Sequence, residues 1–246
     1  MGKRIGIMQP YFFPYVGYYQ LISAVDAFVV YDNLKYTKKG WINRNRYLEG
    51  GRDVTFTIPL QKGSDELHIN QRFVADNFDR LKLVRRVGQA YRKAPNYDST
   101  ILLFEKAVMN RKTNLFDFIF DSLLLLVEHL DLKTELIRSS EIAIDHQLRS
   151  QDKVIAICRA LDATTYINAI GGQTLYASET FRQHGMDLRF IRSEDLQYSQ
   201  FGQPFQAWLS ILDVLMFNSL DRVRSYIADG YDLVCGEKNS NDVVSV

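Results

Sequence analysis

The chain has 246 residues, of which 46% are apolar and 13% are aromatic, so it can bury a substantial core and an intrinsically disordered chain is excluded. It carries 30 Lys and Arg residues against 29 Asp and Glu residues, for a net charge of +1. This balance excludes the overall basic surface of a protein that coats nucleic acid. Any anion-binding site must therefore be a local patch.

The cysteines and the chain termini bear on where the protein works. Cys158 and Cys235 are too few for a disulfide framework, and Cys158 lies in the apolar run VIAIC, where a buried thiol is expected. The N-terminus has no apolar run of signal-peptide length, and the longest apolar cluster, around 123–127, is too short to span a bilayer. We therefore expect a soluble, cytoplasmic protein with no membrane partner.

Residues 5–32 predict a compact βαβ unit. The two short apolar runs at 5–8 and 27–31 are typical of buried strands. Between them, residues 16–25 carry apolar side chains at helical spacing. Two strands joined by a helix form a parallel pair with a right-handed crossover.

The segment between the first strand and its helix is expected to be a ligand loop. Pro10 and Pro14 fix the backbone there and cannot continue a strand, so they indicate a tight turn. In open parallel sheets, ligands bind beyond the carboxyl ends of the strands. We therefore expect the residues from Gln9 to Tyr18, and those from Asp32 onward, at the active edge.

Alternating apolar side chains then predict a hairpin of strands 54–60 and 67–74 across Gly63. Helical apolar spacing follows, with Ser99 and Asn114 as candidate N-caps. The helices of this segment are expected from Asn77 to just before Pro95, over 100–109, and over 115–130.

The last part of the chain returns to alternating strands and helices. These elements are expected at 135–138, 151–161, 165–168, 175–184, 188–192 and 208–217, before a frayed end at 238–246. The pattern predicts an α/β fold, a Rossmann-like parallel sheet with an added helical segment. We expect an N-terminal βαβ-plus-hairpin half at 1–76, a helical insertion at 77–130, and a C-terminal α/β half at 131–246 that packs with the first.

A basic segment follows the second strand on the expected ligand side. Its twelve residues contain no acid and five cations, Lys35, Lys38, Lys39, Arg44 and Arg46. Arg binds phosphate through two hydrogen bonds, and Lys acts as a point charge. The neighbouring Trp41, Asn43 and Asn45 add an aromatic plane for stacking and neutral hydrogen-bonding groups. The segment predicts a diphosphate clamp, with a solvated basic loop as the alternative.

Two other groups of side chains are candidates. Aromatic residues are dense between Tyr11 and Tyr19, where some belong to the core and the others suit a sugar ring or nucleobase. Asp32 ends a strand and either contacts the substrate or caps a turn.

A third group lies near the C-terminus. Tyr198 and Gln200 carry hydroxyl and amide groups that suit a sugar, and they precede the helix that contains Asp213. A carboxylate in such an apolar helix is costly unless it is paired, so Asp213 either pairs with a buried Arg or faces the site.

Metal and cofactor motifs are absent from the sequence. The four His residues are scattered and have no HxxxH or CxxC partner, and no Walker loop, GxGxxG fingerprint or GxSxG elbow occurs. We expect no metal and no tightly bound cofactor.

Several sequence blocks resemble a known family. They are the opening stretch from Ile5 to Asp32, YTKKGWINRNR, GGQTLYASETFRQHGMDLRF and YSQFGQPFQAWLSILDVLMF. Over about residues 5–218 the chain resembles the WbqC-like family, whose members are encoded among O-antigen and related surface-polysaccharide genes. The resemblance implies a sugar-modifying pathway.

Together with the basic segment beside the aromatic loop, the resemblance motivates the leading hypothesis, a transferase in O-antigen or lipopolysaccharide biosynthesis. The substrate would be a nucleotide-linked amino sugar, with acyl or aminoacyl transfer to its amine from an unidentified donor, for which an aminoacyl-tRNA is one alternative. Asp32 or His68 would take the proton from the sugar ammonium, and Lys39 and Arg44 would hold the diphosphate. The other residues expected to contact the substrate are Gln9, Tyr15, Gly17, Tyr18, Lys38, Trp41, Asn43, Asn45, Tyr198, Gln200 and Asp213.

A more distant likeness leaves two alternatives open. The spacing P-x-x-x-P-x-x-G-Y is similar to the HxGH loop of nucleotidyltransferases, with Tyr15 and Tyr18 at the histidine positions and Gly17 between them. Neutral tyrosines cannot stabilise a leaving pyrophosphate as cations do. One alternative is thus a nucleotidyltransferase that uses a nucleoside triphosphate, and the other is a non-catalytic protein that binds a sugar nucleotide or a partner enzyme.

Overall fold

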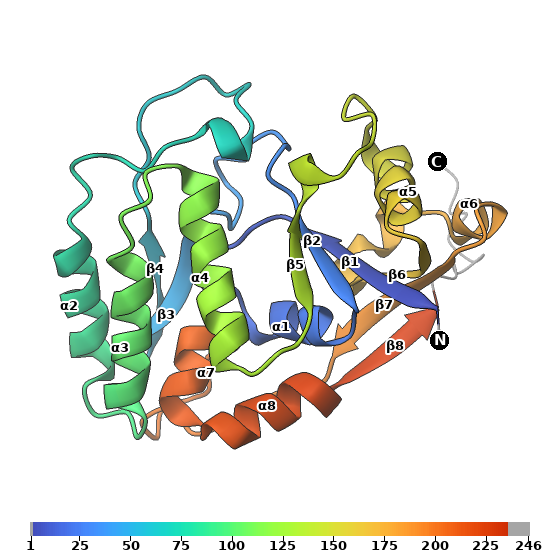
Figure 1. The fold of residues 1–246 in the computed structure, drawn as a ribbon. Helices are drawn as coiled ribbons and strands as arrows, with labels where there is room; N and C mark the ends of the chain where they lie inside the picture. Colours follow the sequence, from blue (N-terminus) through green and yellow to red (C-terminus); the bar gives the residue numbers. More distant parts are fainter. Residues whose placement is uncertain (1, 236–246) are drawn as a thin grey trace, which may run out of the picture.

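The first three elements form the parallel βαβ unit that the sequence predicts. β1 (Lys3–Met8) and β2 (Ala27–Val30) pair in parallel, and α1 (Val16–Ser23) joins them. All side chains of β2 are buried, because this strand is covered on both faces. The structure, a computed structural model, describes residues 2–235 (Figure 1).

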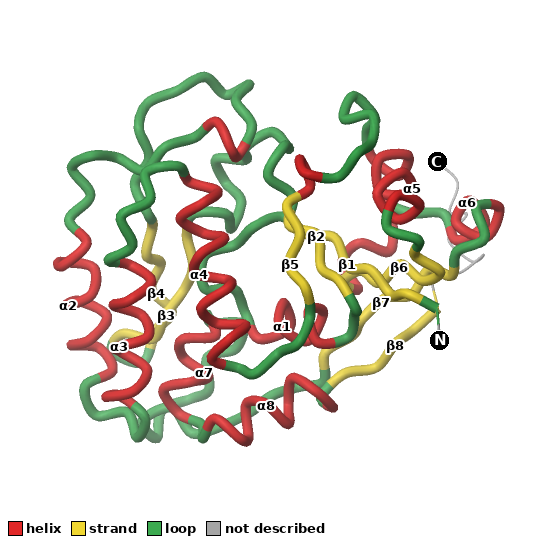
Figure 2. Tube along the Cα trace, viewed as in Figure 1, coloured by secondary structure: helices red, strands yellow, loops and turns green. Residues whose placement is uncertain are grey.

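These strands belong to a six-stranded sheet of order β5-β2-β1-β6-β7-β8 (Figure 2). All neighbours pair in parallel except β8, which is antiparallel to β7. The added strands are β5 (Glu135–Arg138), β6 (Ala163–Ala169), β7 (Asp187–Ser193) and β8 (Tyr231–Cys235). The predicted Rossmann-like α/β sheet is confirmed, and β8 is an element that the sequence pattern did not indicate.

Helices cover both faces of the sheet, and the face that each helix covers indicates where a ligand crevice is expected. α1 and α8 (Leu220–Asp229) pack on one face, with α7 (Ile211–Phe217) beside them. α5 (Ser150–Ala160) and α6 (Ser178–Gln183) pack on the other. The helices that follow β1 and β6 therefore lie on opposite faces, which puts the ligand crevice of such a sheet at the carboxyl ends of these two strands.

The hairpin lies elsewhere in the chain than expected. β3 (Arg44–Glu49) and β4 (Arg52–Thr57) pair antiparallel across Gly50–Gly51. The two glycines have φ angles of 61° and 75°, the left-handed backbone that a two-residue hairpin turn requires. Residues 67–74 form one turn of 3-10 helix and isolated bridges, so the prediction of a hairpin across Gly63 is wrong.

The added helical segment lies beside this hairpin (Figure 1, left). It consists of α2 (Arg80–Tyr91), α3 (Tyr97–Val108) and α4 (Leu115–His129). Asn114 caps α4 as predicted, since its side chain accepts two backbone hydrogen bonds of the first turn. Ser99 does not cap α3, because it lies inside that helix. One continuous core runs from α1 through the hairpin and α2–α4 to α7 and α8.

The helix predicted over 208–217 begins later than expected. Ser210 is its N-cap and accepts a hydrogen bond from the N–H of Leu212. Trp208 has a φ of 61°, a left-handed backbone that cannot continue into a right-handed helix. The C-terminal segment 238–246, for which fraying is expected, lies outside the described residues.

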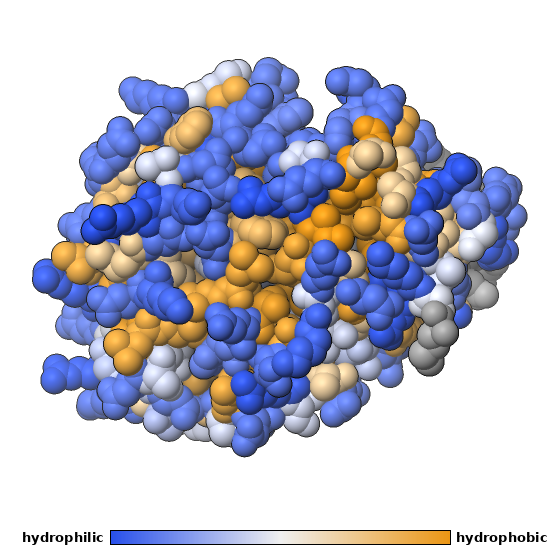
Figure 3. All heavy atoms as spheres, in the orientation of Figure 1, coloured by the Kyte–Doolittle hydropathy of each residue, from blue (hydrophilic) through white to orange (hydrophobic). Residues whose placement is uncertain are grey.

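One face of the molecule carries an apolar band. Figure 3 shows apolar side chains gathered across the area of α4 and β5. α4 contributes the exposed Leu124, and β5 is an edge strand whose last three residues are half-buried. Within residues 2–235, no helix combines the length and apolarity that crossing a bilayer requires.

Candidate functional site

The loop between β1 and α1 forms one wall of an aromatic cavity. Phe12 and Phe13 turn into the core and are fully buried, while Tyr11 and Tyr15 remain half-buried at the surface. The cavity has a volume of about 300 Å³. It is lined by Tyr11, Pro14, Tyr15, Trp41, Asn45, Arg46 and Trp208.

Three distant segments meet at this cavity because hydrogen bonds converge on the loop. The Asn45 side-chain amide of β3 donates to the carbonyl of Phe13 at 2.6 Å. The hydroxyl of Ser210, from the segment before α7, donates to the same carbonyl at 2.7 Å. The backbone N–H of Ser210 donates to the carbonyl of Arg46 at 2.9 Å. Asn45 therefore lines the cavity while its side chain holds the loop.

Arg46 is the charged side chain of the cavity. Its guanidinium carbon lies 5.3 Å from the centroid of the Trp41 ring. One Nη donates to the carbonyl of Trp208 at 3.0 Å, and the other lies 3.2 Å from the Asp53 carboxylate. These contacts fix the guanidinium at the cavity wall, where its charge favours a ligand with an anionic group.

Two exposed tryptophans line the cavity together with this guanidinium. The exposed fractions of Trp41 and Trp208 are 40% and 61%, and the Tyr15 ring centroid lies 5.0 Å from that of Trp208. A left-handed backbone is strained for so bulky a residue as Trp208, and such strain is concentrated at functional sites. Aromatic faces beside a cation suit a flat ring that carries a negative group.

A smaller cavity of about 130 Å³ shares Tyr15 and Trp208 with the first. Its other lining residues include Asp195, which follows β7, and the aromatic side chains of Tyr198 and Phe205. Both cavities are thus lined in part by the loops that follow the carboxyl ends of β1 and β7.

The Tyr198 hydroxyl and the Gln200 amide converge on Asp213. The fully buried Asp213 carboxylate accepts hydrogen bonds of 2.7 Å from the Tyr91 hydroxyl, the Tyr198 hydroxyl and the Gln200 amide. Burial raises the pKa of Asp213, and these three bonds offset part of that rise. No Arg of the described chain contacts it, so the predicted buried Arg partner is wrong. Neutral donors take that place, and Asp213 anchors the segment that carries Trp208.

Asp32 is held in a separate hydrogen-bond network. Its buried carboxylate accepts hydrogen bonds from the Ser139 hydroxyl at 2.7 Å, the Ser140 N–H at 2.9 Å and the Asn70 amide at 3.0 Å. Burial acts to raise its pKa, but these bonds outweigh it, and the pKa of Asp32 is lowered. A carboxylate so saturated is a weak proton acceptor. Asp32 and the exposed His68 line neither aromatic cavity.

The basic segment is partly neutralised by acids from elsewhere in the chain. Lys35 pairs with Glu66 and Lys38 pairs with Asp65, each at 2.6 Å. The exposed Lys39 has no ion pair with any described residue. The acid-free run of the sequence thus receives its counter-ions from the loop before the 3-10 turn.

The side chains of Arg44 and Asn43 are committed to hydrogen bonds within the protein. Arg44 lies 5.3 Å from the Trp41 ring centroid, and its Nε donates to the carbonyl of Gly40 at 2.8 Å. The buried Asn43 accepts from the Tyr36 hydroxyl at 2.8 Å and donates to a backbone carbonyl at 2.7 Å. Neither residue lines the cavity.

The loop residues compared with the HxGH pattern divide into two groups. Tyr15 lines the cavity, but Tyr18 is buried and its hydroxyl donates to the carbonyl of Gln9 at 2.9 Å. A Cβ on Gly17 would lie 2.9 Å from the Ser193 hydroxyl, so this glycine allows close packing between α1 and β7. The second tyrosine of the pattern is thus committed to the fold.

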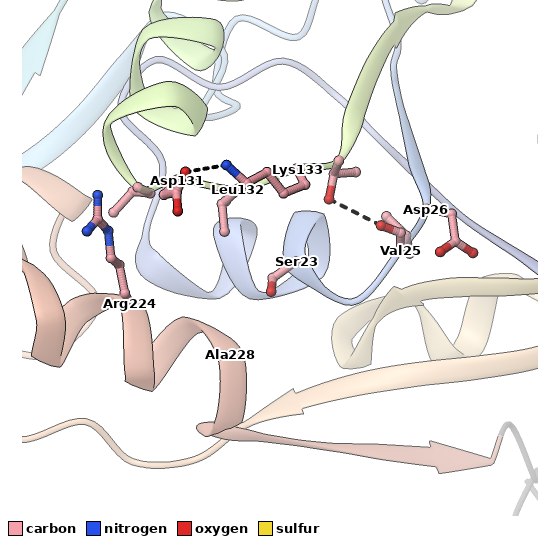
Figure 4. A pocket seen from close by; sticks show the side chains of 10 residues that line it. Ser23, Val25, Asp26, Asp131, Leu132, Lys133, Arg224 and Ala228 are labelled. Atoms are coloured by element: carbon pink, nitrogen blue, oxygen red, sulfur yellow. Dashed lines mark hydrogen bonds and ion pairs between the residues drawn. The ribbon is translucent and has the colours of Figure 1, made fainter.

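A larger hollow of about 510 Å³ lies at the opposite end of the sheet, by the segments that lead into β2 and β5 (Figure 4). Asp131 pairs there with Lys133, and Arg224 donates to the carbonyl of His129 at 2.9 Å. This hollow lies away from the carboxyl edge where such sheets bind ligands. The aromatic cavity is therefore the better candidate site.

Sequence reasoning identified part of this cavity. Tyr15, Trp41 and Asn45 were predicted to contact the substrate, and all three line it. Trp208 was missed, because its apolar surroundings resemble the first turn of a helix. One feature of the sequence could have drawn attention to Trp208, namely that the chain has only two tryptophans.

Comparison with known proteins extends over all three segments of the cavity. The chain is 27% identical over 222 residues to the "Uncharacterized protein Rv1507c" of Mycobacterium tuberculosis (strain ATCC 25618 / H37Rv), a match that covers 88% of this chain and 94% of that protein. The model of the WbqC-like protein family matches residues 9–225, which include the loop after β1, the hairpin and the segment before α7. The chain therefore belongs to the WbqC-like protein family.

Proposed function

We propose that the aromatic cavity binds a nucleotide-linked sugar, and that the protein modifies this sugar in the synthesis of an O-antigen or another surface glycan. One observation carries the proposal: two exposed tryptophans, Trp41 and Trp208, line the same cavity as the fixed guanidinium of Arg46. Aromatic faces stack on a base or sugar ring, and a guanidinium binds phosphate oxygens. The volume of about 300 Å³ lies at the lower end of the range for small-ligand pockets.

The proposed reaction is acyl or aminoacyl transfer to the amine of the sugar. The amine lone pair forms a bond to the acyl carbonyl carbon, the bond from that carbon to the donor's leaving group breaks, and the leaving group keeps the electron pair and takes up the proton that the nitrogen loses. None of the described residues that line the two cavities is Ser, Thr or Cys. This lining favours direct transfer from donor to amine over a covalent acyl-protein intermediate.

A second candidate function is binding without turnover. The aromatic cavity has no carboxylate or histidine among its described lining residues, so it offers no side chain that commonly acts as a general acid or base at neutral pH. The nucleotidyltransferase alternative has less support, because the Tyr18 hydroxyl is committed to a backbone carbonyl.

Intrinsic tryptophan fluorescence tests the proposal, because both tryptophans of the chain line the cavity. The probes are the uridine, thymidine, guanosine and cytidine diphosphate conjugates of glucose. We expect one conjugate to quench the emission, and Arg46→Ala to weaken its binding about tenfold or more, since a charged hydrogen bond contributes about 1.5–3 kcal/mol.

The matched control is Arg52→Ala, which removes an exposed guanidinium from the far end of the same hairpin. Equal binding by the Arg46 and Arg52 variants, or no quenching by any conjugate, would rule the proposal out. Turnover is then assayed by mass spectrometry with the amino-sugar conjugate and an acyl donor, and its absence with intact binding would favour the second candidate.

A further inference from the structure

We propose that the smaller cavity beside Tyr15 and Trp208 binds a primary ammonium group, with the Asp195 carboxylate as its counter-ion. This inference rests on the proposed function and deepens it, because the ammonium would belong to the sugar whose nucleotide lies in the aromatic cavity. It assigns a role to Asp195, an acidic residue at the carboxyl edge of the sheet. Neither the sequence pattern nor the lining of the aromatic cavity indicated this residue.

The two cavities are arranged to hold neighbouring parts of one ligand. Tyr15 and Trp208 line both, so groups bound in the two cavities would touch the same pair of rings. The smaller volume of about 130 Å³ equals about four water molecules at ~30 Å³ each. It has room for one small polar group and adjoining carbons.

The walls of the smaller cavity suit a cation. Four aromatic side chains contribute to its lining, Tyr15, Tyr198, Phe205 and Trp208. The Tyr198 and Phe205 ring centroids lie 5.1 Å apart with an interplanar angle of 80°, so the two rings form an edge-to-face corner. Aromatic faces attract ammonium groups through their negative quadrupole. These rings would also accept an apolar group, so the charge beside them determines whether the cavity prefers a cation or an apolar group.

That charge is the carboxylate of Asp195. It is exposed and makes no ion pair or hydrogen bond with any other described residue. Burial raises the pKa of Tyr15, and the nearby Asp195 charge acts in the same direction, which places the carboxylate within electrostatic reach of the shared ring. Arg222 donates to the backbone carbonyl of Gln197 and leaves Asp195 without a counter-ion.

The corner formed by Tyr198 and Phe205 is held in place without a ligand. The Tyr198 hydroxyl donates to the buried Asp213, and the Gln200 side chain both donates to and accepts from the backbone of Gln206. These bonds fold residues 198–206 into one fixed turn. A preorganised cavity binds with less loss of conformational freedom.

The charges of the two cavities are opposite. Arg46 is the charged side chain of the aromatic cavity, and Asp195 is the charged side chain of the smaller cavity. A ligand that fills both therefore carries an anionic part and a cationic part. A nucleoside diphosphate joined to an amino sugar has this distribution, whereas its hydroxyl or acetamido counterpart lacks the cation.

The test compares glucosamine with glucose, which differ only in carrying an ammonium or a hydroxyl at one carbon. In Trp41→Phe, the emission of Trp208 alone reports binding at the shared wall. We expect glucosamine to bind about tenfold more tightly than glucose, from one ion pair and one cation–π contact. Asp195→Asn should reduce this preference to within about twofold, while Glu194→Gln, a neutralised neighbour outside the cavity lining, should retain it.

Three results would overturn the inference: equal affinities for the two sugars, a preference that survives in Asp195→Asn, or no response to glucosamine at any soluble concentration. These monosaccharides contain no nucleotide, so the measurement is independent of the wild-type response to the diphosphate conjugates. A conjugate response without amine preference would reject only the ammonium site. A lost conjugate response with amine preference would reject only the nucleotide assignment.

Discussion

Two buried carboxylates, Asp32 and Asp213, have pKa values shifted in opposite directions. Burial raises the pKa of Asp213, and the side-chain donors around it offset only part of that rise. Asp32 is also buried, but its bonds include a backbone N–H, and together they lower its pKa. The balance between lost hydration and hydrogen bonding to the ionised form decides the sign in each case. Neither residue needs a substrate to explain its position.

We expect Asp32→Asn to lower the free energy of unfolding by about 1–3 kcal/mol at pH 7, because one of its donors loses an acceptor. Since the pKa is lower in the folded protein than in the unfolded chain, the ionised group stabilises the fold above about pH 4. This stabilisation is lost as the pH falls through the folded pKa. Urea unfolding at several pH values measures the difference between wild type and variant, which should shrink toward acid.

The control for this prediction is Asp229→Asn, which neutralises an exposed carboxylate at the end of α8. It should change the free energy of unfolding by less than about 0.5 kcal/mol. A difference for Asp32→Asn that is constant from pH 7 to acid would mean that its charge plays no part.

At the scale of elements, the start of a helix depends on which side chain reaches the free N–H groups. Asn114 accepts from the N–H groups of Phe116 and Asp117, and its amide also donates to the carbonyl of Asn70 at 2.7 Å. It therefore links α4 to the turn that contains Asn70. Ser99 instead lies within α3, where its hydroxyl donates back to a carbonyl.

Asn114→Ala should destabilise the protein by about 1–2 kcal/mol, because it removes the cap of α4 and the link to Asn70. Ser99→Ala, at the residue that the sequence pattern assigned as a cap, should change stability by less than about 0.5 kcal/mol. Thermal or urea unfolding of the two variants makes the comparison. Equal losses would contradict the assignment of the caps.

For the whole molecule, the sheet separates two cores, and the two cysteines differ in their relation to them. Cys158 lies fully buried in the core under α5, and burial raises its pKa to about 12. Cys235 is exposed at the end of the edge strand β8. The thiolate is the reactive form, so the two thiols should differ greatly in reactivity.

We expect a thiol reagent to label one cysteine rapidly in the native protein and both in denaturant. Labelling of Cys158 requires the core to open, so its rate reports the free energy of that opening. Cys235→Ser should leave no rapidly labelled thiol. Rapid labelling of two thiols in the native wild type would mean that the α5 face is open.

Elements that depend on local periodicity and on caps can be predicted from the amino-acid sequence. The βαβ unit, the bounds of β5 and the cap of α4 follow from apolar spacing and from side chains a few residues away. The density of aromatic residues after β1 likewise marked a segment that lines the aromatic cavity. The predicted hairpin is misplaced, because β3 begins with Arg44, Asn45 and Arg46 and lacks the apolar alternation that would mark it as a strand.

Which polar side chains are free to meet a ligand depends on contacts between segments that are distant in the sequence. Lys35 and Lys38 pair with acids about thirty residues further along the chain, and Asp213 accepts hydrogen bonds from side chains on two other segments. Trp208 joins Trp41 because Ser210 and Arg46 tie their segments together. These pairs form because the folded chain brings the two side chains within hydrogen-bonding distance. The order of residues along the chain does not specify that distance.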